Sequence, residues 1–216
     1  MNTDSLRITE IFHSLQGETT TSGIPTVFVR LTGCPLRCDY CDTAYAFEGG
    51  QQMTLVEILD NVSKYDCPYV TVTGGEPLAQ PQCIELLQML CDKGYRASLE
   101  TGGAICVKKV DSRVIKIVDL KTPGSGEVSR NLYSNIEYLN PSDEVKFVIC
   151  DRNDYDWSCL KIDELKLHEK ISEILFSPSQ QQQSPRELAE WILKDKLKVR
   201  MQMQMHKTIW GDKPGH

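Results

Sequence analysis

The segment TGCPLRCDYCDT (residues 32–43) carries three cysteines within eight positions, Cys34, Cys38 and Cys41, in the spacing C-x3-C-x2-C. A structural zinc site needs four ligands, usually from two separated pairs, and no histidine or second CxxC lies near enough in the sequence to complete this set. A [4Fe–4S] cluster takes one ligand per iron, so three thiolates leave one iron open to something that is not protein. The spacing therefore favours a cluster that does chemistry over one that only passes electrons.

Apolar, β-branched runs predict seven strands, at 26–31, 69–73, 97–101, 115–120, 145–149, 174–176 and 199–205. Most are nearly continuously apolar, as strands covered on both faces are, whereas the last alternates apolar and polar residues. Three helices are predicted between them: one over 55–65 with a capping box at its start, one over 82–93, and one from Ser184 to about Lys194.

Strands that alternate with helices predict an α/β fold with a parallel sheet, either open or curled into a barrel. In such folds the chemistry gathers at the carboxyl ends of the strands. Five unusual segments follow predicted strands: GCPLRCDYC, GGEP, ETGG, KTPGSG and SPSQQ. We therefore expect these five segments to form one site.

At 216 residues the chain is predicted to form a single domain over residues 1–216. A net charge of −6 and a pI of about 5.3 argue against nucleic-acid and anionic-membrane partners. No signal-peptide pattern and no apolar run of the roughly 20 residues that span a bilayer are visible. Nine cysteines are an odd count that suits no disulfide framework, so we expect a cytoplasmic protein. The other six, expected at core or neutral positions, are Cys67, Cys83, Cys91, Cys106, Cys150 and Cys159.

The C-x3-C-x2-C motif, with the aromatic Tyr40 before its last cysteine, resembles the signature of radical S-adenosylmethionine (SAM) enzymes. The resemblance implies an incomplete, TIM-like βα barrel in which SAM chelates the open iron. Reduction of the cluster then splits SAM to a 5′-deoxyadenosyl radical, which takes a hydrogen atom from the substrate. TVTGGEP (71–77) is similar to the family's GGE motif, whose backbone and carboxylate meet the amino group of SAM. This assigns Gly74, Gly75 and Glu76 to SAM binding.

Two segments, EIFHSLQGETTTSGIPTVFVRLTGCPLRCDYCDT and MQMHKTIWGDKPGH, resemble the 7-carboxy-7-deazaguanine synthases of queuosine biosynthesis. These radical SAM lyases convert 6-carboxy-5,6,7,8-tetrahydropterin to 7-carboxy-7-deazaguanine by ring contraction with loss of ammonia. The resemblance is densest over residues 10–43, 71–77 and 199–210, and loosest over 125–170. It implies a [4Fe–4S] cluster, SAM and Mg²⁺ as cofactors, a homodimer, and a flavodoxin or ferredoxin as electron donor.

Arg30 is a charge in an otherwise apolar predicted strand, just before the cysteine segment. A buried guanidinium without an anionic partner is very costly. A bidentate grip on the substrate carboxylate supplies such a partner. The alternative is a structural ion pair with an internal Asp or Glu.

The remaining substrate contacts are implied by the resemblance, and they fall in the SLQGE segment, at a strand end and near the C-terminus: Leu15, Gln16, Gly17, Glu18, Thr73 and His206. Backbone groups and the Gln16 amide suit the donors and acceptors along a pterin edge. Glu18 joins them or is a solvated loop carboxylate. His206, at the end of the alternating strand, faces the substrate or is a satisfied core histidine. The terminal Lys213-Pro214-Gly215-His216 departs from the family's pattern, in which this end meets the pterin.

The resemblance makes the hydroxyl of Thr43 a Mg²⁺ ligand, with substrate oxygens and water completing the coordination. Without the resemblance, a threonine here is a loop or cap residue. The SAM contacts implied beyond the GGE motif are Tyr40 against the adenine, Asp119, Lys121, Ser177, Pro178, Ser179 and Gln180. Glu100 in ETGG bonds ribose hydroxyls, caps a helix or forms an ion pair.

Two other functions compete with a synthase that acts on a small pterin. A glycyl-radical-enzyme activating enzyme is also a small radical SAM protein, but its substrate is the backbone of a partner protein, whereas SLQGE and Arg30 suit a compact anionic ligand. A non-enzymatic iron–sulfur carrier normally supplies a fourth cysteine and has no use for a GGEP loop. The sequence therefore favours the synthase.

Overall fold

The computed structural model describes residues 4–180, 182–211, 213 and 215. Its strands form one curved sheet in the order β3-β1-β2-β4-β5-β6-β7-β8-β9. Their bounds are β1 Ser5–Leu15, β2 Pro25–Leu31, β3 Gln51–Thr54, β4 Tyr69–Gly74, β5 Arg96–Thr101, β6 Ile115–Asp119, β7 Glu144–Ile149, β8 Glu173–Pro178 and β9 Arg200–Met201. Pairing is parallel from β2 to β9 and antiparallel between β1 and its two neighbours. Because β3 and β9 end the strand order, the barrel stays open, which confirms the predicted incomplete βα barrel.

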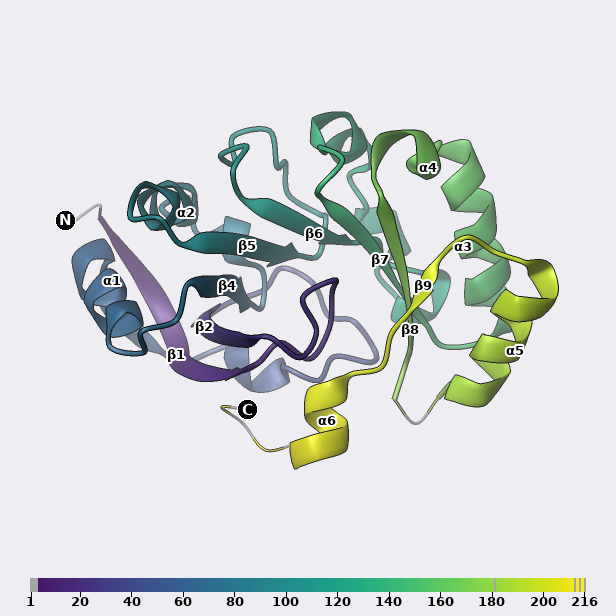
Figure 1. Ribbon diagram of the computed structural model, residues 1–216, viewed down its shortest axis with the longest axis horizontal. Helices are drawn as coiled ribbons and strands as arrows, with labels where there is room; N and C mark the ends of the chain where they lie inside the picture. Colours follow the sequence, from purple (N-terminus) through teal and green to yellow (C-terminus); the bar gives the residue numbers. More distant parts are fainter. Residues whose placement is uncertain (1–3, 181, 212, 214, 216) are drawn as a thin grey trace.

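Helices follow the strands and lie around the outside of the curved sheet (Figure 1). They are α1 Leu55–Ser63, α2 Cys83–Asp92, α3 Arg152–Glu164, α4 Leu167–Lys170 and α5 Pro185–Asp195, while α6 Met205–Trp210 lies at the open side of the sheet. The predicted capping box of α1 is confirmed, because Thr54 accepts a hydrogen bond from the backbone of Glu57, whose side chain accepts one from the Thr54 backbone. Ser184 caps α5 by accepting a hydrogen bond from the backbone N–H of Glu187, and Pro185 occupies the first helical position.

Side chains alternate between the two faces of the sheet, and β7 shows how this separates core from site. Val145, Phe147 and Ile149 are fully buried against the helices, and the Phe147 ring packs edge-on against Trp157 of α3 with centroids 6.3 Å apart. The intervening Lys146 and Val148 point to the inner face and line a cavity. The outer face therefore stabilises the fold, and the inner face is left for polar residues.

The predicted strand over 199–205 is wrong over most of its length, since β9 is two residues long and α6 begins at Met205. The alternating glutamines bond to loops instead of extending a ladder: Gln202 Oε1 accepts from the backbone N of Thr19 at 2.8 Å, and Gln204 Nε2 donates to Glu18 at 3.0 Å. The strands β1 and β3 and the helix α3 were not predicted. Burial alternates over the first four residues of β1, Ser5 to Ile8, as in an antiparallel strand with one covered face.

Cys67, Cys83 and Cys150 are buried, Cys91 and Cys159 are half-buried, and all nine cysteines are free thiols. Cys106 is exposed. None of the described helices combines the length and apolarity that crossing a bilayer requires.

Candidate active site

The carboxyl ends of the parallel strands surround a cavity of about 560 Å³, a volume typical of small-molecule sites. Every predicted site residue except Glu76 lies in its wall. These residues are Leu15, Gln16, Gly17, Glu18, Arg30, Cys34, Cys38, Tyr40, Cys41, Thr43, Thr73, Gly74, Gly75, Asp119, Lys121, Ser177, Pro178, Ser179, Gln180 and His206. The structure thus gathers the five segments that follow predicted strands around one cavity.

The cysteine loop follows β2 and interlocks with the GGEP loop that follows β4. The backbone N–H of Glu76 donates to the carbonyl of Gly33 at 2.9 Å. A Cβ on Gly75 would lie 2.3 Å from that carbonyl oxygen and 2.7 Å from the Cβ of Cys34, so only glycine fits there. The close approach that the two glycines permit is therefore, in the first place, an approach between two loops of the protein.

The three cysteine side chains line the same part of the cavity, and their environment suits a cluster better than a single ion. Among the described residues, no three His, Cys, Asp or Glu side chains converge on one metal position. A cubane does not need such convergence, because each thiolate binds a different iron. Burial raises the pKa of Cys38 to about 11 although Lys121 opposes the rise, so iron binding there displaces a proton.

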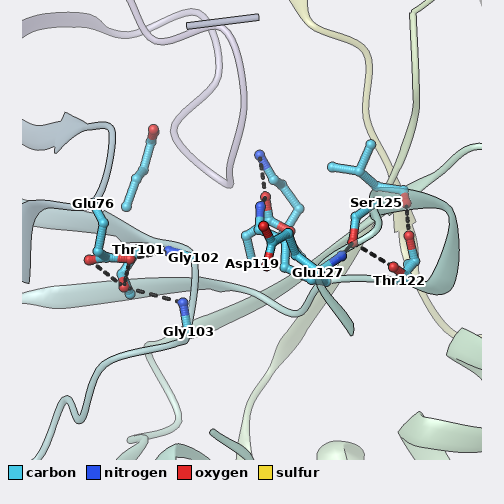
Figure 2. Close-up of polar contacts among 12 residues, drawn as sticks. Glu76, Thr101, Gly102, Gly103, Asp119, Thr122, Ser125 and Glu127 are labelled. Atoms are coloured by element: carbon cyan, nitrogen blue, oxygen red, sulfur yellow. Dashed lines mark hydrogen bonds and ion pairs between the residues drawn. The ribbon is translucent and has the colours of Figure 1, made fainter. Parts of the chain in front are cut away.

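Tyr40, Asp119 and Lys121 form the part of the wall that was predicted to bind SAM. Lys121 Nζ lies 2.9 Å from Asp119 Oδ2 and 5.7 Å from the centre of the Tyr40 ring, and Figure 2 shows the Asp119 contact. The Tyr40 hydroxyl and Asp119 Oδ1 are buried and have no hydrogen-bond partner in the described part of the chain. Buried polar atoms are costly to leave unpaired. These two atoms therefore fit a polar ligand such as the adenosyl part of SAM.

Glu76 lies behind the cavity wall, which differs from the predicted direct contact with SAM. Its carboxylate is completely buried and accepts hydrogen bonds from the Thr101 hydroxyl at 2.9 Å and the Gly102 backbone N–H at 2.8 Å (Figure 2). The Leu78 backbone N–H donates to it as well, at 3.1 Å. Burial raises the pKa of Glu76, and these donors oppose the rise. The side chain joins the GGEP loop to the ETGG segment, whose Thr101 and Gly102 do line the cavity.

The segment 177–180 at the end of β8 closes the side of the cavity that was predicted to bind SAM. Ser177 and Ser179 are both 3 % exposed. The Ser179 backbone N–H donates to the Ile149 carbonyl at 2.8 Å, and its hydroxyl donates to Gln182 Oε1 at 2.6 Å. Gln182, which the sequence analysis did not single out, also lines the cavity.

Gln16 and Thr73 share a carboxylate partner, Glu100, on the inner face of the sheet. Gln16 Nε2 donates to Glu100 Oε1 at 3.2 Å, and Thr73 Oγ1 donates to Glu100 Oε2 at 2.9 Å. Burial raises the pKa of Glu100, and the nearby Glu18 adds to the rise. Among the described residues, Glu100 caps no helix and forms no ion pair; it accepts the hydrogen bonds from Gln16 and Thr73, and its contact with ribose hydroxyls stays a prediction.

Glu18 is not a solvated loop carboxylate, as one of the two alternatives had it. Its Oε2 lies 2.6 Å from Lys146 Nζ on β7, and only 13 % of its side chain is exposed. Burial alone would raise the pKa of Glu18, but the charge and hydrogen bond of Lys146, together with the hydrogen bond from Gln204, hold it below the ordinary value.

Arg30 pairs with Glu10, which lies directly opposite it in the β1–β2 register. The Nε–Oε1 distance is 2.7 Å, and Tyr45 donates to the same oxygen at 2.8 Å. The structural ion pair, which was the alternative role for Arg30, is therefore present, and Arg30 forms it through its Nε atom. Arg30 also lines the cavity, so the contact with Glu10 fixes the orientation of a guanidinium that faces the ligand space.

Thr43 has the geometry that a neutral metal ligand needs. Its hydroxyl donates to Asp42 Oδ1 at 2.8 Å, which leaves the oxygen lone pairs free. The other Asp42 oxygen lies 3.0 Å from Lys207 Nζ and accepts from Gln204 at 3.0 Å. Burial opposes ionisation of Asp42, but Lys207 keeps its pKa well below the ordinary value. One alcohol with free lone pairs fits a hydrated Mg²⁺.

His206 lies in the first turn of α6 rather than at the end of a strand, and it packs directly on Gly17. The Met205 backbone N–H donates to the Gly17 carbonyl at 3.0 Å. Lys213 and Gly215 also line the cavity, whereas Pro214 and His216 lie outside the described residues.

Sequence analysis missed several wall residues, chiefly Lys146, Asp42, Gln204 and Lys207. Lys146 carried a usable signal, since it is a lone charge in the apolar run VKFVI, as Arg30 is in its own strand. The other three are polar loop or helix residues with no local signal.

A model of the Radical SAM superfamily matches residues 28–192 of the sequence. The chain therefore belongs to the radical SAM enzymes, the class in which a [4Fe–4S] cluster and SAM act together. A curated relative, the 7-carboxy-7-deazaguanine synthase of Chlorobaculum tepidum, is 47 % identical over 98 % of this chain and 97 % of its own. The synthase of Koribacter versatilis is 41 % identical over 95 % and 97 %. Within the superfamily, the chain belongs to the 7-carboxy-7-deazaguanine synthase family.

A solved structure supports the fold. The crystal structure of QueE from Escherichia coli superposes with a TM-score of 0.75 over 94 % of this chain and 95 % of that one, at 24 % identity.

Proposed function

We propose that this protein is a radical SAM lyase that converts 6-carboxy-5,6,7,8-tetrahydropterin to 7-carboxy-7-deazaguanine with loss of ammonia. The observation that carries the proposal is the single cavity, which has the three cysteines in its wall together with the polar residues of the SLQGE segment. Near full-length similarity to synthases of that name supports the choice of substrate.

The two ligands divide the cavity between them. SAM binds beside the cysteine loop, in contact with Tyr40, Asp119, Lys121 and the segment 177–180. Gln16, Glu18, Arg30, Thr73 and His206 hold the pterin, with the guanidinium of Arg30 toward its carboxylate. When bound, the reduced cluster and SAM supply the hydrogen-atom abstraction that starts the reaction. The side chains need only bind, orient and exclude water in that step.

Thr43 is the proposed protein ligand of Mg²⁺, supported by the hydrogen bond that turns its hydroxyl proton toward Asp42. The ion would polarise the substrate and fix its carboxylate while water completes the coordination.

The family resemblance further supports a homodimer and a flavodoxin or ferredoxin as electron donor. We propose one domain over residues 1–216, since a single sheet carries every segment of the site. Nine free thiols suit a cytoplasmic location.

Two alternatives are weaker. An activating enzyme for a glycyl-radical protein is not favoured, because the curated relatives are named as synthases of a small molecule. A non-enzymatic cluster carrier would not explain the buried Tyr40 hydroxyl and Asp119 Oδ1, which have no hydrogen-bond partner among the residues that the structure describes.

Anaerobic reconstitution with iron and sulfide, followed by SAM, a reductant, Mg²⁺ and the carboxypterin, tests the proposal. We expect 5′-deoxyadenosine and 7-carboxy-7-deazaguanine by mass spectrometry, and neither product when the reductant is omitted. 5′-Deoxyadenosine without the deazaguanine would contradict the substrate assignment. A loaded cluster that never cleaves SAM would contradict the enzyme class.

A further inference from the structure

Lys146 of β7 is a charged side chain in the cavity wall. It belongs neither to the residues proposed to hold the pterin (the pterin pocket) nor to those proposed to bind SAM (the SAM pocket). In the sheet it lies beside Asp119 of β6 and Leu175 of β8. Its neighbours along the strand, Val145 and Phe147, point to the core. Its ammonium group therefore faces the cavity, and 16 % of the side chain is exposed.

The ammonium group touches both pockets. Its Nζ lies 2.6 Å from Glu18 Oε2, in the segment proposed to hold the pterin, and 3.8 Å from Asp119 Oδ2, in the part proposed to hold SAM. Asp119 in turn lies 2.9 Å from Lys121. Glu18, Lys146, Asp119 and Lys121 thus form a line of alternating charges across the cavity.

The two carboxylates depend on Lys146 to different degrees. Asp119 keeps Lys121 at 2.9 Å if Lys146 is removed. Within the described part of the chain, the Glu18 carboxylate then keeps only the amides of Gln204 at 3.0 Å and Gln202 at 3.4 Å. A buried carboxylate without a cation is strongly disfavoured. Loss of Lys146 therefore displaces or neutralises Glu18 first and disturbs Asp119 less.

We propose that Lys146 is a positioning residue that holds Glu18 in the pterin pocket and Asp119 in the SAM pocket, so that the two ligands are bound at a fixed mutual distance. Hydrogen-atom transfer needs that distance to be fixed, because an error of 1 Å in placement can cost about 100-fold in rate. The inference rests on the proposed function, since it assigns a role within the same site.

Four variants of the reconstituted enzyme test the inference: Lys146→Met, Lys146→Arg, Glu18→Gln and the double variant Lys146→Met/Glu18→Gln. The measurements are pterin and SAM affinities by equilibrium binding without reductant, and the ratio of 5′-deoxyadenosine to deazaguanine during turnover. Lys170→Met, at an exposed lysine outside the cavity, is the matched control.

We expect Lys146→Met to weaken pterin binding at least tenfold and SAM binding less than threefold, and to raise the product ratio. Lys146→Arg should restore most of the coupling, since it keeps the charge. The double variant should bind pterin no more weakly than the weaker single variant, because both substitutions break one contact. If Lys146→Met does not fold, Lys146→Arg and Glu18→Gln test the inference in its place. For Glu18→Gln we expect the pterin affinity to fall while the SAM affinity stays unchanged.

Unchanged pterin affinity and product ratio in Lys146→Met, or additive losses in the double variant, would overturn the inference while wild-type product formation still upheld the proposed function. Absence of the deazaguanine from the wild-type reaction would refute the function instead.

Discussion

Gly17 lies against His206, and an alanine at this position measures how tightly the C-terminal helix shapes the pterin end of the cavity. An added Cβ would stand 2.1 Å from Nδ1 of His206, 2.9 Å from its Cγ and 3.1 Å from its backbone N. Non-bonded heavy atoms rest at about 3.5–4.0 Å. A rotation of the His206 side chain about χ1 relieves the two contacts with the ring, whereas the contact with the backbone N remains and is tighter than ordinary van der Waals contact.

The imidazole of His206 must therefore leave its position in the cavity wall, or α6 must move relative to the turn after β1, which strains the hydrogen bond from Met205 N to the Gly17 carbonyl. A misplacement of 1 Å at a binding site can cost about 100-fold. We expect kcat/KM for the pterin to fall by about two orders of magnitude, or about 2.7 kcal/mol of transition-state stabilisation. SAM affinity should change little, because the proposed SAM residues lie on β6, β8 and the cysteine loop.

The assay is steady-state deazaguanine formation with varied pterin, with SAM binding and thermal unfolding measured on the same preparation. Ser22→Ala is the matched control, since it changes an exposed residue of the same connection between β1 and β2. A folded Gly17→Ala enzyme with kcat/KM within threefold of wild type would show that the position of α6 does not govern pterin use.

Cys38→Ala should abolish the iron–sulfur absorbance and all SAM cleavage, and an intact, active cluster in this variant would contradict the ligand assignment. Arg30→Ala should weaken pterin binding at least tenfold in equilibrium titrations while SAM cleavage stays measurable; an unchanged affinity would leave only the ion pair with Glu10. Thr43→Ala should reduce the stimulation of turnover by Mg²⁺, and an identical Mg²⁺ titration would refute the hydroxyl as a ligand. Asp143→Ala should lower the free energy of unfolding by about 3–5 kcal/mol in urea, because it leaves the buried ammonium of Lys116, now 2.8 Å from Asp143, without its carboxylate; a loss below 1 kcal/mol would contradict this.

The parts of the site that follow parallel strands were predictable from sequence. The order of strands did not have to be known, because carboxyl ends of parallel strands meet at one edge whichever strands are neighbours. The cysteine loop, the GGEP loop and the segment 177–180 came together for this reason. The spacing of the cysteine and GGE motifs then indicated which cofactors the site binds.

Contacts that depend on register or on side-chain direction were not predictable in the same way. The partner of Arg30 is Glu10 of β1, and choosing it requires knowing that β1 pairs antiparallel with β2 in this register. The Met–Gln alternation before α6 has the period of a strand, but its glutamines bond to loops. Likewise, the burial of the Glu76 carboxylate among donors from three residues depends on the tertiary structure and could not be predicted from the motif.

The hydrogen bond between Gln204 and Glu18 spans 186 positions of the chain, whereas the interlocked cysteine and GGEP loops lie within residues 33–76. During synthesis on the ribosome, the contact between these two loops can form while most of the polypeptide is still unmade, and the cysteine loop is completed when Ser125, whose carbonyl accepts from the Asp39 backbone N–H, has been added. The substrate half must wait until the last helix emerges. A nascent or truncated chain is therefore expected to acquire iron before it can accommodate its substrate, and a fusion placed after α6 disturbs the later of these two events.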